Sequence, residues 1–208
     1  MKSILVPISS FENGIAPLTY AIEFAKQTSA RIYIIKTYGP NIVTGSIKTV
    51  GSLLEKDAKK EIKSVVKSVD NKGVEIIASV VKGRLYENIL AFRKTIAVDL
   101  IISASNRISK DETVFIGKIT GSIIKNIDCP ILIIPPDYSF KPVNTILMAI
   151  KSGIIKRDGI LDPLKLLLAS FGAKLNLLQV ITPKLKNEDL AIHSELANLT
   201  NQTATISR

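Results

Sequence analysis

The sequence predicts an α/β fold, a doubly wound five-stranded parallel sheet followed by a partial β-α-β repeat. Three observations support it. Short apolar runs alternate with helical patterns through residues 1–136. These runs are almost continuously apolar, as in strands that are buried on both faces. The opening pattern then returns after residue 143. Right-handed crossovers leave few topologies, and we expect strand order 3-2-1-4-5.

The elements follow one another at regular intervals. After a first strand ending at a Ser-Ser turn, Leu18, Ala21, Ile22 and Ala25 recur at helical spacing, with Pro17 in the first turn. Three further amphipathic helices separate the later strands. The predicted strands are residues 3–8, 31–37, 74–81, 99–103 and 130–135.

A linker and an internal repeat follow. Prolines mark a linker at 137–143, between a first domain (1–136) and a second (144–208). "TILMAIK" (145–151) mirrors "SILVPIS" (3–9), but we expect the repeat to stop after β-α-β, leaving a tail with one short helix. Such a unit buries too little surface to be stable alone. We therefore expect it to dock on the first domain or to pair with another chain; alternatively, the whole sequence is a fragment of a longer tandem protein.

Composition indicates a cytoplasmic globular protein. Of the 208 residues, 46% are hydrophobic and the mean hydropathy is +0.27, which allows a substantial core. No run approaches the roughly 18–20 apolar residues of a membrane span, so we expect no membrane partner. The apolar segment at the start is too short for a secretory signal. A single cysteine, Cys129, excludes an internal disulfide.

The charge distribution argues against nucleic acid as a specific partner. The formal charge is +10, which favours anions in general. However, "EKDAKKEIKSVVKSVDNK" mixes lysines with acids, as on a solvated helix face. No aromatic residue lies in a basic cluster where bases could stack.

The predicted topology places a ligand cleft between the first and fourth strands. Ligands of open parallel sheets bind beyond the carboxyl ends of strands, where the strand order reverses. The flanking loops are residues 8–11 and 103–107. The fourth helix begins near Gly117, and its free N–H groups would attract a phosphate.

Residues 1–136 resemble the universal stress protein family. The resemblance rests on "KSILVPI", "ARIYIIK", "VVKGRLYENIL", "DLIISAS" and "GKITGSIIKNIDCPILIIP", in this order and spacing, and extends more weakly over 143–182. It implies an adenine nucleotide alpha hydrolase-like fold. It also implies dimers through the fifth strand (130–135), here with the second copy of the repeat or with another chain.

The same resemblance implies a pocket for ATP or another adenine nucleotide. Nucleotide-binding members carry Gly-x-x-Gly after strand four, Gly-Ser or Gly-Thr at the next helix, and an aspartate after strand one. The glycines let backbone N–H groups approach phosphates. By position, the implied pocket residues of this chain are Pro7, Ser9, Thr37, Ser103, Ala104, Arg107, Gly117, Lys118 and Ile119.

Several of these positions depart from the family pattern. Ala104 and Arg107 replace the loop glycines, Lys118 replaces a small hydroxyl residue, and Ser9 replaces the aspartate. A bulky residue at positive φ carries about 1–2 kcal/mol of strain. Either Arg107 and Lys118 hold a phosphate by charge, or the pocket is degenerate and no cofactor binds.

Three classes of function therefore compete. They are a nucleotide-responsive stress regulator, an interaction module that has lost the nucleotide, and an enzyme such as a nucleotide hydrolase. The enzyme is disfavoured because no general base or metal-binding carboxylate pair is evident. Position 112, where a Walker motif needs glycine, is Glu112, and His193 and Cys129 are too far apart in the chain to suggest a metal site.

Overall fold

The computed structural model divides the chain into two compact units, Met1–Phe140 and Lys141–Arg208. It describes residues 1–39, 48–105, 118–135, 138–152, 154–155, 157–181, 192–200 and 202–207. The division falls inside the predicted linker 137–143. We keep 1–136 and 144–208 as the proposed domain limits.

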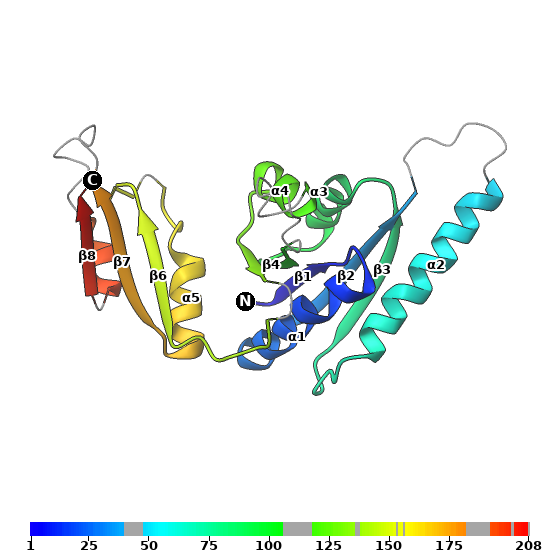
Figure 1. The fold of residues 1–208 in the computed structure, drawn as a ribbon, viewed down its shortest axis with the longest axis horizontal. Helices are drawn as coiled ribbons and strands as arrows, with labels where there is room; N and C mark the ends of the chain where they lie inside the picture. The colour runs from blue at the N-terminus through cyan, green and yellow to red at the C-terminus, as the bar shows by residue number, and fades with distance from the viewer. Residues whose placement is uncertain are drawn as a thin grey trace. The chain divides into compact units, whose positions relative to one another are not determined.

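The first unit is a five-stranded parallel sheet with helices on both faces (Figure 1). The strand order is β3-β2-β1-β4-β5, so the predicted 3-2-1-4-5 arrangement is confirmed. Its elements are β1 (Ser3–Pro7), α1 (Phe11–Thr28), β2 (Arg31–Tyr38), α2 (Lys48–Lys67), β3 (Ile76–Lys82), α3 (Leu85–Thr95), β4 (Leu100–Ala104), α4 (Lys118–Asn126) and β5 (Ile131–Ile134).

The core forms because the central strands are apolar on both sides. Leu5, Ile35 and Ile101 point to one face, where they pack with Ile89 of α3 and Ile123 of α4. The alternate residues of β1 and β2 point to the other face, which α1 and α2 cover (Figure 1). The sheet is thereby held between two helical layers, and the carboxyl ends of its strands meet at one edge.

Helix α1 begins earlier than the sequence pattern indicates. The Ser10 hydroxyl caps it by accepting a hydrogen bond from the Asn13 N–H at 3.3 Å. Pro17 therefore lies inside α1 and not in its first turn, and the prediction for this residue was wrong. The early start places the β1–α1 turn directly beside the carboxyl end of β2.

The second unit has one strand more than the sequence indicated. It consists of β6 (Thr145–Ile150), α5 (Asp162–Phe171), β7 (Lys174–Ile181), α6 (Ser194–Leu199) and β8 (Gln202–Ser207). The three strands are parallel in the order β6-β7-β8. This unit thus repeats the β-α-β-α-β pattern of the first half of unit 1. The polar segment that forms β8 lacks the apolar run by which the other strands were predicted.

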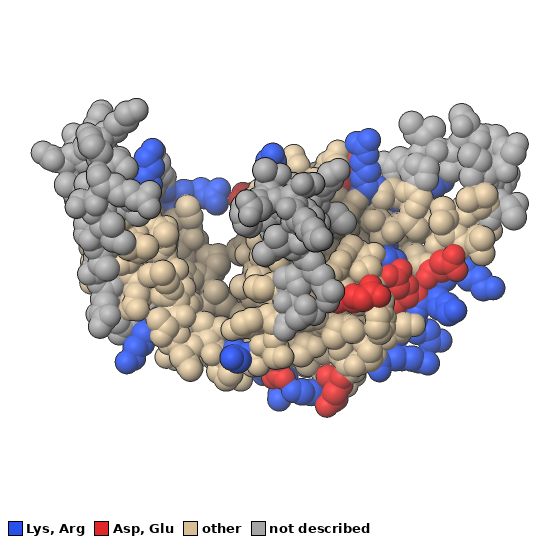
Figure 2. Space-filling model, in the orientation of Figure 1, with Lys and Arg blue, Asp and Glu red and all other residues tan. Residues whose placement is uncertain are grey.

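Charged side chains are unevenly spread on the first unit. On the face shown in Figure 2, basic side chains gather along the outer side of α2, and acidic side chains lie toward α1. Within the described residues, no helix is long and apolar enough to cross a membrane.

Candidate functional site

The carboxyl ends of β1 and β4 border the candidate site. Ile4 and Leu5 of β1 pair with Leu100 and Ile101 of β4, so these two strands are neighbours as the cleft prediction requires. The chain leaves β1 toward α1 on one face and leaves β4 toward α4 on the other. The strand order therefore reverses here, at the place where ligands of open parallel sheets bind.

Four of the predicted pocket residues line one small hollow at this point. They are Pro7, Ser9, Ser103 and Ala104. The hollow measures about 20 Å³, which is the room of a single water molecule. Three further residues complete its lining: Asn13 of α1, Leu85 of α3 and Thr120 of α4.

Thr120 links α4 to the end of β4. Its hydroxyl donates to the Ala104 carbonyl at 2.9 Å and lies 3.2 Å from the Ser103 hydroxyl. Ser103 and Thr120 are 3% exposed, so these bonds are shielded from water. Because the single Thr120 hydroxyl proton goes to Ala104, Ser103 is the donor between the two hydroxyls.

Of the other predicted pocket residues, only the side chain of Thr37 is described. Thr37 lies near the end of β2, pairs with Val81 of β3 and does not line the hollow. Arg107 and Gly117 lie outside the described residues. Lys118 and Ile119 begin α4, but their side chains are not described. The nucleotide pocket thus remains a prediction, and what the structure shows is that four of its residues line one hollow.

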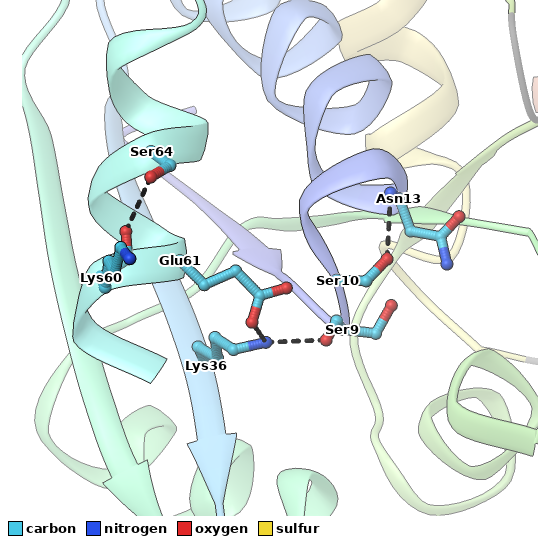
Figure 3. Close-up of polar contacts among 7 residues, drawn as sticks. All are labelled: Ser9, Ser10, Asn13, Lys36, Lys60, Glu61 and Ser64. Atoms are coloured by element: carbon cyan, nitrogen blue, oxygen red, sulfur yellow. Dashed lines mark hydrogen bonds and ion pairs between the residues drawn. The ribbon is translucent and has the colours of Figure 1, made fainter. Parts of the chain in front are cut away.

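A buried lysine holds the Ser9 turn in place (Figure 3). The Lys36 ammonium on β2 donates to the Ser9 carbonyl at 2.7 Å and pairs with the Glu61 carboxylate of α2 at 2.8 Å. Lys36 is only 6% exposed. Buried lysines are rare unless they are paired, and here both partners are supplied by neighbouring elements.

This arrangement fixes the electrostatics around Ser9. The carboxylate beside this turn in Figure 3 is that of Glu61, and it forms an ion pair with Lys36. The exposed Ser9 side chain is neutral where an acidic acceptor was expected from the family pattern. The described half of the site therefore offers the exposed Ser9 hydroxyl and backbone groups to a ligand, and its ion pair is already satisfied.

Sequence reasoning missed Lys36, Glu61, Asn13, Leu85 and Thr120. Lys36 could have been noticed, because it lies inside the predicted strand "RIYIIKT", whose other charged residue, Arg31, stands at the first position. Asn13 and Thr120 gave no such signal, since polar residues near helix starts are common. Among the described residues, no group of three or more His, Cys, Asp or Glu side chains could hold a metal ion.

Cys129 has no features of a reactive thiol. Its Sγ donates to the Val98 carbonyl at 3.4 Å, and it packs against the core beneath α4. Burial raises its pKa from 9.0 to about 11, against a smaller lowering by the charge of Arg93. The neutral thiol is thereby favoured.

Known sequences match this chain mainly over its first unit. The universal stress protein family model matches residues 1–135. A curated universal stress protein of Methanocaldococcus jannaschii is 25% identical over 138 residues, covering 64% of this chain and 81% of that protein.

Solved structures share the fold. A universal stress protein from Archaeoglobus fulgidus DSM 4304 matches with a TM-score of 0.74 at 17% identity, covering 99% of this chain and 78% of that one. UspA from Lactobacillus plantarum matches with a TM-score of 0.55 at 18% identity, over 64% of this chain and 97% of that one. A universal stress protein solved in complex with cAMP has a TM-score of 0.52 at 14% identity, over 65% and 98%.

Proposed function

The chain belongs to the universal stress protein family, and from this premise we propose that it is a stress-response regulator that acts as an interaction module with a degenerate nucleotide pocket. The observation that carries the proposal is the state of the Ser9 turn. The aspartate that the family pattern places after strand one, to contact the adenosine, is replaced by the neutral Ser9, and the nearby Glu61 is paired with Lys36.

Loss of that carboxylate removes the specific contact expected for the adenosine part of a ligand. A site built around a hydrogen-bond acceptor discriminates strongly, because an unpaired partner is costly. With Ser9 in that place, the ribose hydroxyl groups or the adenine amino group would meet only a neutral side chain. The bulk of Ala104 adds to this, since a methyl group stands where family members carry glycine.

The competing proposal is that Arg107 and Lys118 hold the phosphates of ATP by charge. Guanidinium and ammonium groups both bind phosphate well. A structural neighbour solved with cAMP makes cyclic nucleotides a second ligand worth testing. Both proposals concern the same cleft, so one set of titrations separates them.

Calorimetric titration with ATP, ADP, cAMP and inorganic phosphate tests the proposal. We expect no heat of binding and no thermal shift for the natural sequence. The combined variant S9D/R107G/K118S, which restores the family residues at three positions, should gain ATP binding. Submillimolar binding of ATP by the natural sequence, abolished by R107G or K118A, would establish the competing proposal.

The protein is further proposed to be non-enzymatic and to associate through β5. This strand is the edge of the sheet, and Ile131, Leu132 and Ile133 are only partly buried. Exposed edges favour pairing with another strand. Light scattering should show a dimer. If it shows a monomer, hydrogen exchange should find the β5 amides protected by the second unit. A monomer with unprotected β5 amides, or ATP turnover above a blank, would contradict these statements.

A further inference from the structure

The solvent-facing side of α2 carries a ridge of four lysines, Lys56, Lys60, Lys63 and Lys67. Their spacing of four, three and four residues places them within about 60° of arc on a helix, along about 16 Å of its axis. All four are exposed. Ala58, Ile62 and Val65, on the opposite side of α2, are buried against the first unit.

The structure separates these lysines from the acids that accompany them in the sequence. Glu55 pairs with Lys59 at 2.5 Å and accepts a hydrogen bond from the Tyr38 hydroxyl. Glu61 turns inward to Lys36 (Figure 3). Of the three acids in α2, only Asp57 has no ion-pair partner among the described residues, and it lines a hollow with Phe11 of α1 and Lys60. The mixed charge pattern of the sequence is thus a segregated one in the fold (Figure 2).

The four lysines themselves are not neutralised by neighbours. Within the described part of the chain, none of the four side chains is in an ion pair. The protein carries a formal charge of +10, so its overall field adds to their attraction for anions. A row of unpaired cations on a firmly packed helix is favourable for an extended anion with regularly spaced charges.

We propose that this lysine ridge binds the phosphate backbone of nucleic acid without sequence specificity. The four lysines span about 16 Å of the helix axis, and over that length one strand of a duplex presents about five phosphates, at about 3.4 Å each. Each contact releases condensed counterions from the nucleic acid, which gives polyanions an advantage that a single anion lacks.

The chemistry of the ridge disfavours other macromolecules. Exposed ion pairs with an acidic protein add little affinity each, and the described exposed apolar residues of α2 (Val50, Leu53 and Leu54) all precede Lys56. A membrane-surface helix would need such apolar side chains among its cations. The ridge also lacks aromatic residues, so it can hold a backbone but cannot stack bases.

Fluorescence anisotropy with a short labelled duplex, over a series of salt concentrations, tests the inference. Four phosphate contacts predict that log Kobs falls with log salt with a slope of about −3 to −4. The variant K60Q/K63Q should reduce the magnitude of that slope by about 2. The control K82Q/K94Q removes the same charge from exposed lysines of β3 and α3, and it should leave the slope nearly unchanged.

Three results would overturn the inference. They are absence of duplex binding at low salt, equal loss in the two variants, and binding of anionic vesicles with no binding of the duplex. Dependence on duplex sequence would also contradict a purely backbone contact. All four substituted lysines are exposed, so circular dichroism of the variants should match that of the natural sequence.

Discussion

Replacement of Lys36 by methionine tests whether the buried lysine holds the Ser9 turn. Methionine keeps most of the length of the side chain but removes both charge-assisted bonds, to the Ser9 carbonyl and to Glu61. Breaking a fully buried ion pair costs about 3–5 kcal/mol. Because the Glu61 side chain is 32% exposed, water can solvate the carboxylate that is left behind. We therefore expect K36M to lower the free energy of unfolding of the first unit by about 2–3 kcal/mol.

Hydrogen exchange measures this loss in the correct unit. Ile34, in the interior strand β2, is buried, and its amide reports on opening of the first sheet. The matched control is K59M, because Lys59 forms an exposed pair with Glu55 and should contribute less than about 1 kcal/mol. The amides after Ser9 should also lose protection in K36M, since the Ser9 carbonyl is no longer bonded to the Lys36 side chain.

A double-mutant cycle isolates the pair itself. Glu61→Gln alone leaves the Lys36 charge with the Ser9 carbonyl as its remaining partner, and the double variant K36M/E61Q removes both charges. We expect the sum of the two single losses of unfolding free energy to exceed the loss in K36M/E61Q by about 1 kcal/mol or more. An effect of K36M equal to that of K59M, or additive single effects, would refute the stated role of Lys36.

Two further predictions concern packing and the thiol. Gly14→Ala should destabilise the protein by about 1 kcal/mol in chemical unfolding, because its Cβ would lie 3.1 Å from Ile8 and Val65 side-chain atoms. Gly121→Ala, with open space around the new Cβ, should stabilise the protein by about 0.5–1 kcal/mol. A Gly14→Ala variant more stable than Gly121→Ala would contradict this packing. Cys129 should react about a hundredfold more slowly with a thiol reagent at pH 8 in the folded than in the unfolded chain, because its pKa is raised to about 11. The stability that its neutral thiol contributes should be lost as the pH rises from 9 through 11, and equal labelling rates would contradict the burial.

The sequence was sufficient to predict the sheet of the first unit. Its strands are apolar on both faces and its helices on one, so periodicity separates them, and the crossover rule then restricts their order. β8 escaped prediction because "QTATIS" carries no such apolar pattern. Its strand arises from pairing along β7, which local sequence does not encode.

The candidate site was predicted in part. Pro7, Ser9, Ser103 and Ala104 lie together because strand ends converge in any parallel sheet, and this follows from topology. The role of Lys36 could not be predicted, since it depends on how the next helix, α2, packs on the sheet and brings Glu61 to it. For the same reason, the separation of acids from the lysine ridge is visible only in the fold.

A crystal structure grown in excess ATP is the most direct test of the central claim. The account predicts that no adenosine density appears beside Pro7 and Ser9, and that Lys36 keeps its bonds to the Ser9 carbonyl and Glu61. Adenine or ribose density in contact with Ser9 would contradict the account.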